Sequence, residues 1–384
     1  MEARRKTLSK LVMSLRVLIV PDKFKGTLTA QAAADAIARG WRKARPGDRL
    51  ELLPMSDGGD GFGEVLADLL GARRKSVRTV DAAHRPLTAP WWWEPRTKTA
   101  IIESAKVVGL ALLPRGKFHP FELDTFGLGA ALEAAAANGA RHILVGIGGS
   151  ATNDAGFGVA RALGWKFFDR AGAAIESWTD LPPLSRAVAP RRKLIRDLRV
   201  AVDVQNPLLG VRGCSRIYGP QKGLRKRDFA RSEMCLRRLA DILARDLGRD
   251  DRREPGAGAA GGLGFGLRAF LSARLLPGFD LFATHAALDR RLRMCDVVIT
   301  GEGALDRSTL MGKGVGEIAR RARARGLPCI GLGGVVNDRA SLTRLFTETH
   351  ALAPDLTDGE SAMRQAAPWL ELLSNRAARS LALL

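Results

Sequence analysis

The segment from Ile143 to Gly158 constrains the fold of this chain most strongly. The apolar run Ile143–Val145 is followed by the glycine-rich sequence Gly-Ile-Gly-Gly-Ser-Ala-Thr-Asn-Asp and then by a weakly helical segment. A buried strand, a tight loop and a helix in this order are typical of α/β proteins with a parallel sheet. The segment therefore predicts an α/β fold in which this loop presents backbone N–H groups to an anion.

The residue types of the loop suit anion binding. Glycine permits a positive φ and a close approach of a ligand to the backbone. Hydroxyl groups can donate to a phosphate or a carboxylate, and an asparagine or aspartate suits a helix cap or a metal-bound water. The predicted binding residues of this loop are Gly148, Gly149, Ser150, Thr152 and Asp154.

The same loop also fits a dinucleotide-binding pattern. The sequence from Gly146 to Ala151 matches G-x-G-x-x-G/A, and Asp169 ends the next apolar run at about the distance expected of a ribose-binding acid. An NAD(P)-dependent oxidoreductase is therefore the alternative function. A second match at Gly256–Gly261 follows Asp-Arg-Arg-Glu-Pro instead of a strand, so the pattern alone is a weak signal.

Length and composition limit the classes of protein that fit. A chain of 384 residues predicts two domains. The formal charge of +21 favours anionic partners, but the basic residues are spread along helices and no aromatic residues interleave with them. We therefore expect no specific nucleic-acid binding. The 4 cysteines form no C-x-x-C pair, which favours a reducing cytoplasm over a disulfide or zinc framework.

Membrane targeting is not expected. The basic N-terminal stretch is followed by an apolar run that Ser14 and Arg16 interrupt, which is unlike a signal peptide. No segment approaches the length of a membrane-spanning helix.

Two further predicted strands end in charged, glycine-containing loops. The run Val17–Val20 is followed by Asp22 and Lys25, and the run Leu50–Leu53 is followed by Asp57 in a sequence rich in glycine. Open α/β sheets bind ligands at the carboxyl ends of their strands, so these three polar residues are predicted to bind substrate or nucleotide.

The later strands repeat this arrangement. The run Leu198–Val204 carries Asp203 and is followed by Asn206, and a short loop then places Lys222 between glycines. The strand 294–300 is expected to feed a loop that reaches the next helix at 315. That loop contains an acid, a second acid, a hydroxyl and a lysine, at Glu302, Asp306, Thr309 and Lys313, but not with Walker A spacing.

Together these loops favour phosphoryl transfer. That reaction uses cations over the phosphates, carboxylates for Mg²⁺ and a base for the acceptor hydroxyl. Hydride transfer would need one nucleotide loop and not so many acids of the type that binds Mg²⁺. The loops therefore favour a kinase over a dehydrogenase.

The chain resembles the bacterial glycerate kinase type-1 family along almost its whole length. The matching stretches are Pro21-Asp-Lys-Phe-Lys-Gly, Ser56-Asp-Gly-Gly-Asp-Gly, Gly146-Ile-Gly-Gly-Ser-Ala-Thr, Asp203-Val-Gln-Asn-Pro, Gly219-Pro-Gln-Lys-Gly, Gly256-Ala-Gly-Ala-Ala-Gly-Gly and Thr300-Gly-Glu-Gly. The resemblance implies ATP-dependent phosphorylation of D-glycerate, giving 2-phosphoglycerate, with Mg²⁺. It also implies a flavodoxin-like α/β domain built from both chain ends, an inserted α/β domain, and a site in the cleft between them.

Near residue 72 the sequence changes from regular strand and helix patterns to an irregular stretch, and this change sets the expected domain limit. We expect the flavodoxin-like domain at 15–71 plus 286–384 and the inserted domain at 72–285. The sequence departs from the family pattern at Asp60 (commonly Glu), Gln205 (Asp), Asn153 (Val) and Ala155 (Gly). These departures bear on substrate choice and not on the type of reaction.

Roles follow from motif position. Asp203, Asp306 and Lys313 are the predicted catalytic residues, and Asp203 and Glu302 the predicted Mg²⁺ ligands. Lys25, Lys222 and Lys313 are expected to neutralise phosphate or carboxylate charge.

Overall fold

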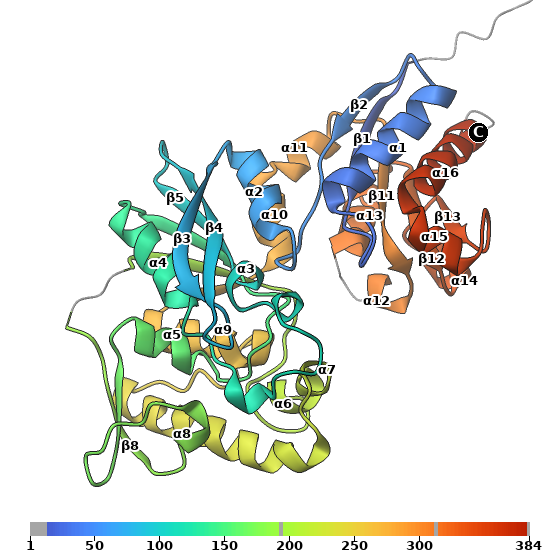
Figure 1. Cartoon of the computed structure of the whole chain (residues 1–384). Helices are drawn as coiled ribbons and strands as arrows, with labels where there is room; N and C mark the ends of the chain where they lie inside the picture. Colours follow the sequence, from blue (N-terminus) through green and yellow to red (C-terminus); the bar gives the residue numbers. More distant parts are fainter. Residues whose placement is uncertain (1–13, 192–194, 311–313, 382–384) are drawn as a thin grey trace, which may run out of the picture. The chain divides into compact units, whose positions relative to one another are not determined.

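The computed structural model describes residues 14–191, 195–310 and 314–381 (Figure 1). The chain divides into two compact units, which are described separately. Unit 1 comprises residues 1–55 and 287–384, and unit 2 comprises residues 56–286. One unit is thus built from both chain ends and the other from the segment between them.

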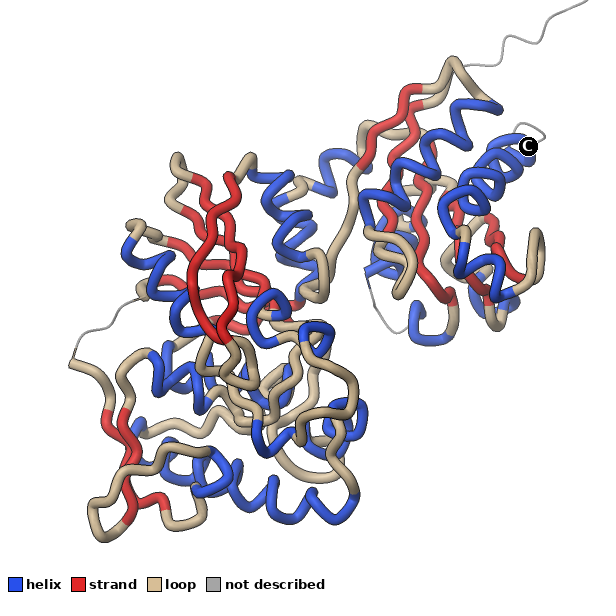
Figure 2. Tube along the Cα trace, viewed as in Figure 1, coloured by secondary structure: helices blue, strands red, loops and turns tan. Residues whose placement is uncertain are grey.

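Unit 1 contains a five-stranded sheet, whose strands are drawn in red in Figure 2. All of its strands are parallel. Its order is β13-β12-β11-β1-β2. The strands are β1 (Arg16–Pro21), β2 (Arg49–Leu52), β11 (Val297–Leu305), β12 (Cys329–Val336) and β13 (Glu348–Ala353). This is the flavodoxin-like order, and it confirms the predicted fold class.

Helices flank the sheet of unit 1. They are α1 (Ala30–Ala44), α11 (Leu288–Leu292), α12 (Arg307–Leu310), α13 (Gly314–Arg323), α14 (Arg339–Leu342), α15 (Gly359–Arg364) and α16 (Ala366–Leu381). Thr29 caps α1 by accepting the backbone N–H of Ala32. Helices α1 and α16 can pack closely because Gly40 has no side chain. A Cβ there would lie only 2.0 Å from the carbonyl oxygen of Glu371.

Unit 2 contains a six-stranded mixed sheet in the order β10-β9-β6-β5-β4-β3. Its strands are β3 (Arg73–Val80), β4 (Pro86–Glu94), β5 (Thr99–Glu103), β6 (His142–Gly146), β9 (Asp197–Val202) and β10 (Arg274–Pro277). Strands β5, β6, β9 and β10 are parallel, and β3 and β4 are antiparallel. The four parallel strands therefore end at one edge of the sheet.

Helices and a small hairpin complete unit 2. The helices are α2 (Phe62–Leu70), α3 (Ala105–Val108), α4 (Leu128–Ala137), α5 (Phe157–Ala162), α6 (Cys214–Ile217), α7 (Gly219–Lys222), α8 (Phe229–Leu247), α9 (Ala259–Leu271) and α10 (Gly278–His285). The strands β7 (Lys166–Asp169) and β8 (Leu184–Val188) pair antiparallel in a separate two-stranded sheet.

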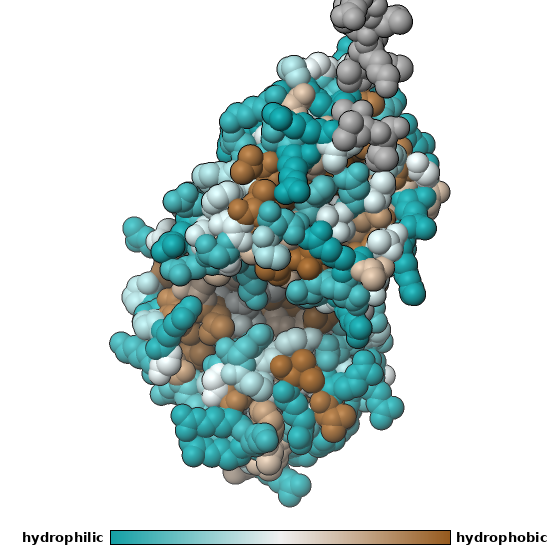
Figure 3. All heavy atoms as spheres, turned by 90° about the vertical axis from the view of Figure 1, so that its right-hand side faces the viewer, coloured by the Kyte–Doolittle hydropathy of each residue, from teal (hydrophilic) through white to brown (hydrophobic). Residues whose placement is uncertain are grey.

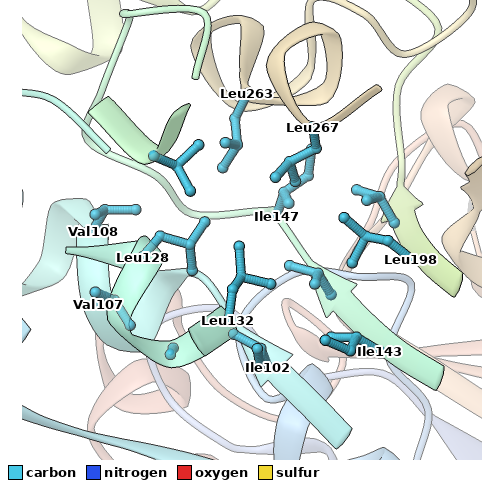
Figure 4. Packing of buried hydrophobic residues seen from close by; sticks show 14 of the residues in the cluster. Ile102, Val107, Val108, Leu128, Leu132, Ile143, Ile147, Leu198, Leu263 and Leu267 are labelled. Atoms are coloured by element: carbon cyan, nitrogen blue, oxygen red, sulfur yellow. The ribbon is translucent and has the colours of Figure 1, made fainter. Parts of the chain in front are cut away.

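The core of unit 2 lies between the parallel strands and the helices α4 and α9. Figure 4 shows Ile102, Ile143 and Leu198 from three neighbouring strands with Leu132 and Leu263 from the helices. All five side chains are buried. This packing anchors the strand ends from which the loops described below emerge.

The division between the units differs from the expected limits at 71/72 and 285/286. Helix α2 belongs to unit 2, because Phe62 packs in one cluster with Trp92 and Ile101. A Cβ at Gly63 would lie 2.0 Å from the Trp92 ring, so the helix sits directly on strand β4. The first change of unit therefore falls between Met55 and Ser56, and the second between Ala286 and Ala287.

The surface shown in Figure 3 is mainly hydrophilic, with separate patches of apolar side chains. Within the described ranges, no helix combines the length and apolar character that crossing a bilayer requires.

Candidate functional site

Two predicted loops of unit 2 pack directly on each other at the carboxyl edge of its sheet. We call Ser56–Gly61 the aspartate loop and Gly146–Asp154 the glycine loop. The N–H of Gly148 donates to the carbonyl oxygen of Gly58 at 3.0 Å. A Cβ at Gly148 would lie 2.6 Å from the Cα of Gly59, so the two backbones touch.

The carboxylate of Asp60 in the aspartate loop lies beside the accessible part of the glycine loop. Gly149 is exposed, and a Cβ there would lie 2.4 Å from Oδ1 of Asp60. Asp57 is half-buried, and its carbonyl group packs against the backbone of Gly278. The structure thus brings the loop that carries Asp57 into contact with Gly148 and Gly149.

Lys222 is turned into the glycine loop. It is the last residue of α7, a helical turn where the sequence indicated a loop, and it is buried. Its Nζ donates to Oγ of Ser150 at 2.9 Å and to the carbonyl oxygen of Thr152 at 2.7 Å. Burial lowers the pKa of this ammonium to about 8. Lys222 therefore holds the loop from behind, beside its predicted role of neutralising ligand charge.

Asp154 is fully buried and closes the turn from the glycine loop into α5. Its Oδ2 accepts the N–H of Thr125 at 2.9 Å, the Thr125 hydroxyl at 2.7 Å and the N–H of Gly158 at 2.9 Å. Burial, with a smaller contribution from Asp124, raises the pKa of Asp154 to about 6. Its oxygens thus organise the loop from inside the unit.

The side chains of Thr152 and Asn153 also point into the interior. The Asn153 amide donates to the hydroxyls of Ser215 at 3.0 Å and Ser232 at 2.8 Å. These two serines accept hydrogen bonds from an asparagine at a position where the family that the sequence resembles commonly has valine. Oγ1 of Thr152 and Oδ1 of Asn153 are buried without a hydrogen-bond partner in the described part of the chain.

A second glycine-rich segment, 256–266, packs against the other side of the glycine loop. A Cβ at Gly261 would lie 1.9 Å from the carbonyl oxygen of Thr152, and one at Gly266 would lie 2.3 Å from that of Ala155. The N–H of Ala155 donates to the carbonyl oxygen of Gly261 at 3.1 Å. These glycines serve contact between two backbones, which explains the second G-x-G-x-x-G match without a nucleotide.

Asp203 and Asn206 follow strand β9 and differ in their surroundings. Asp203 is exposed. Burial, with a smaller contribution from the negative charge of Asp203, raises the pKa of Tyr218 to about 12. Asn206 accepts the Tyr218 hydroxyl at 2.6 Å and donates to the carbonyl oxygen of Arg212 at 2.8 Å. Asn206 therefore locks the turn, while Asp203 lies at an accessible strand end.

In unit 1, strand β11 continues past Thr300, where the sequence indicated a loop. It continues because Glu302 and Leu305 pair in register with Gly333 and Val336 of β12. Oγ1 of Thr309 donates to Oε1 of Glu302 at 3.0 Å and lies 3.2 Å from the N–H of Asp306. The structure thus brings these three predicted residues together.

The loop after β1 lies beside them. The N–H of Asp22 donates to the carbonyl oxygen of Gly301 at 2.9 Å. Lys25 is exposed, and a Cβ at Gly303 would lie 3.3 Å from its backbone nitrogen. The predicted catalytic Lys313 lies outside the described residues.

The predicted Mg²⁺ ligands fall in different units, Asp203 in unit 2 and Glu302 in unit 1. Across residues 14–191, 195–310 and 314–381, no group of three or more His, Cys, Asp or Glu is arranged to hold a metal ion.

The alternative prediction of a dinucleotide site was wrong. Asp169 ends β7, which pairs antiparallel with β8 in a separate two-stranded sheet and is not the next strand of a parallel βαβ unit. Gly148 packs on the backbone of the aspartate loop, because a Cβ there would lie 2.6 Å from the Cα of Gly59.

Sequence reasoning missed Glu103, the last residue of β5. Its side chain is 1% exposed, and its two oxygens accept the N–H groups of Gly61 at 3.1 Å and Gly63 at 2.9 Å. Burial raises the pKa of this carboxyl to about 7. The sequence feature that could have identified Glu103 is a single acid directly after the apolar run Ala100–Ile102.

A cavity of about 500 Å³ lies elsewhere in unit 1, beside the edge strand β13. Arg339 and Asp355 form an ion pair in its wall at 2.5 Å. None of the predicted site residues lines it.

Comparison with known proteins identifies the family. The model of the glycerate kinase family matches residues 17–382. A glycerate kinase of Halalkalibacterium halodurans is 37% identical over 373 residues, covering 95% of this chain and 97% of the relative. The glycerate 2-kinase of Escherichia coli is 36% identical over 332 residues, covering 84% of this chain and 86% of the relative.

A solved structure from Salmonella typhimurium LT2 that bears the name glycerate kinase 2 has the same two-domain fold. It superposes with a TM-score of 0.81 at 31% identity and covers 97% of this chain and 99% of that one. The chain is thus an enzyme and belongs to the glycerate kinase family.

Proposed function

We propose that this enzyme transfers the γ-phosphoryl group of ATP to the 2-hydroxyl of D-glycerate, in the presence of Mg²⁺, to give 2-phosphoglycerate and ADP. The 2-position is supported by the relative named glycerate 2-kinase. The observation that carries the proposal is the packing of the aspartate loop on Gly148 beside the exposed Gly149.

D-glycerate suits that part of unit 2. It carries one carboxylate and two hydroxyl groups, which need donors and acceptors close together. The backbone at Gly149 is exposed and has no side chain of its own to exclude a carboxylate, and Asp60 lies beside it as an acceptor for a hydroxyl group, with Asp57 in the same loop. We assign these residues to substrate binding.

The proposed chemistry is an in-line displacement. The 2-hydroxyl oxygen of D-glycerate attacks the γ-phosphorus, the bond from that phosphorus to the β,γ-bridging oxygen breaks, and ADP leaves. Asp203, at the exposed end of β9, is the proposed acceptor of the hydroxyl proton.

Unit 1 offers an oxygen ligand for Mg²⁺ and a cation for phosphate. The carboxylate of Glu302 would supply oxygen, which Mg²⁺ prefers, and water and phosphate oxygens would supply the remaining ligands. Glu302 is the proposed ligand, and when bound the ion would neutralise phosphate charge. Lys25 is the proposed phosphate contact at the end of β1.

Incubation of the enzyme with D-glycerate and MgATP, followed by ³¹P NMR of the product, tests the proposal. A phosphate on C2 couples to one carbon-bound proton and gives a doublet, whereas a phosphate on C3 couples to two and gives a triplet. A doublet with release of ADP is expected. A triplet would refute the 2-position, and absence of turnover would refute the proposed reaction.

A further inference from the structure

Glu103 joins the two loops of unit 2 at the point where β5 ends. It pairs in register with Gly146, the first residue of the glycine loop, and the N–H of the next residue, Ser104, donates to the carbonyl oxygen of Gly146 at 2.9 Å. A carboxylate with 1% exposure at this position is costly unless strong hydrogen bonds hold it.

Those hydrogen bonds come from the start of α2. Gly61, the cap residue of this helix, has a φ of 89° and offers no side-chain oxygen to the first N–H groups of the helix. Glu103, 42 residues away, supplies both oxygens instead, one to Gly61 and one to Gly63. A distant strand thereby provides the cap that the first turn requires.

The aspartate loop is consequently fixed at three places. Glu103 holds its last residue, Gly61, and the N–H of Gly148 holds Gly58 near its middle. The backbone of Gly278 packs on the carbonyl group of Asp57 near its start. The freedom of the loop is thus largely removed before any ligand binds.

Charged neighbours face Glu103 from two elements. Nζ of Lys106 in α3 lies 3.9 Å from its Oε1 and 3.0 Å from Oε1 of Glu64 in α2. Lys106 is also attracted to Asp60 of the aspartate loop. The carboxylate of Glu103 therefore has a cation beside it that it shares with Glu64 and Asp60.

We infer that Glu103 is the positioning residue of the aspartate loop: its two bonds to Gly61 and Gly63 align Asp57 and Asp60 against Gly148–Gly149 for D-glycerate binding. Glu103 acts through the loop and does not touch the substrate. We call the two hydrogen bonds from Gly61 and Gly63 to Glu103 the clamp. The assignment of D-glycerate as the ligand rests on the proposed function, whereas the clamp does not.

Glu103→Gln tests this inference. A glutamine amide has one oxygen acceptor and one NH₂ donor, so it can accept only one of the two backbone N–H groups and confronts the other with a donor. The substitution keeps the size of the side chain and removes one of its two hydrogen bonds to Gly61 and Gly63.

Glu94→Gln is the matched control. Glu94 is 6% exposed at the end of β4, and it accepts two backbone N–H groups, from Arg96 at 2.9 Å and Thr97 at 2.7 Å. It pairs with Thr99, at the opposite end of β5 from Glu103. This variant loses the same kind of hydrogen bond in the same sheet, away from both loops.

Two measurements decide the outcome. Hydrogen–deuterium exchange should become faster in peptides covering 56–64 and 146–150 in Glu103→Gln, while Glu94→Gln changes only its own turn. Steady-state kinetics should show the KM for D-glycerate rising about tenfold or more in Glu103→Gln, with the KM for ATP changed less than about twofold and with Glu94→Gln close to wild type.

Unchanged exchange in 56–64 would overturn the clamp. Faster exchange with an unchanged KM for D-glycerate would show a purely structural cap and overturn the positioning role. If wild-type enzyme fails to use D-glycerate, the proposed function is refuted. Hydrogen–deuterium exchange in 56–64 still tests whether Glu103 holds the loop. Should Glu103→Gln not fold, Glu103→Asp, one methylene shorter, is expected to give the same pattern because it cannot reach both N–H groups.

Discussion

Nζ of Lys222 lies 2.9 Å from Oγ of Ser150 and 2.7 Å from the carbonyl oxygen of Thr152. A buried cation thus holds two successive parts of the glycine loop from the interior of unit 2. The loop is therefore supported from behind by α7 and from the front by the aspartate loop.

Lys222→Met should weaken this support. The methionine fills a similar volume but donates no hydrogen bond, and it leaves two buried acceptors without their donor. We expect the free energy of unfolding to fall by about 2 kcal/mol in urea denaturation, with a clear loss of kcat/KM. Lys166→Met, at an exposed lysine of β7, is the control and should match wild type. Equal stability of the two variants would contradict the prediction.

Gly148→Ala should separate the two loops. Its Cβ would lie 2.6 Å from the Cα of Gly59, a backbone atom that cannot rotate away. We expect a loss of about 1–3 kcal/mol in the free energy of unfolding and a large loss of activity. Gly47→Ala, where a Cβ meets nothing within 4 Å, should be nearly neutral. Wild-type activity in Gly148→Ala would show that the loops need not touch.

Thr309→Val should disturb Glu302. Valine has the shape of threonine but lacks the hydroxyl that donates to Oε1 of Glu302 and lies at the N–H of Asp306. If Glu302 binds Mg²⁺, the Mg²⁺ concentration for half-maximal activity should rise and kcat should fall by about tenfold. Thr309→Ser keeps the hydroxyl and should remain near wild type. An unchanged Mg²⁺ dependence in the valine variant would remove Glu302 from the proposed ligands.

Asp154 should make stability depend on pH. Burial raises its pKa from 3.8 to about 6, so the folded protein binds the proton more tightly than the unfolded chain does. The contribution of Asp154 to stability is therefore full below pH 3.8, falls as the pH rises through this window and levels off above 6. The slope from one such group is at most ~1.4 kcal/mol per pH unit.

Asp154→Asn cannot titrate and should lose this part of the slope, as measured by urea denaturation between about pH 4 and 7. Its amide oxygen can still accept hydrogen bonds at the position of Oδ2. Asp68→Asn, at an exposed residue of α2, should keep the wild-type slope. A wild-type slope in Asp154→Asn would contradict the raised pKa.

Apolar runs predicted the central parallel strands of both sheets. Val17–Val20, Ile143–Val145 and Leu198–Val202 fall in β1, β6 and β9, because a strand covered on both faces is mostly apolar. The predicted run to Val204 was two residues too long, since Asp203 and Val204 lie beyond the end of β9. The end of β11 could not be predicted, since Glu302–Leu305 is polar and rich in glycine and extends only because β12 pairs with it.

The site was harder to predict where its contacts are distant in sequence. The burial of Lys222 depends on a loop 70 residues away, and Glu103 binds backbone N–H groups that no residue type reveals. Motif position therefore selected the candidate loops, but it could not distinguish a side chain that faces a ligand from one that holds the loop.

The glycines where these loops touch also limit how the protein can change over time. At Gly148, Gly261 and Gly266 the atom that an added methyl group would meet belongs to another backbone. A larger residue in one segment cannot be offset by a smaller side chain opposite, because no side chain is there to shorten. The glycine loop and the two segments packed on it therefore have to be inherited together, so that exchanging any one of them with a distant homologue requires exchanging all three.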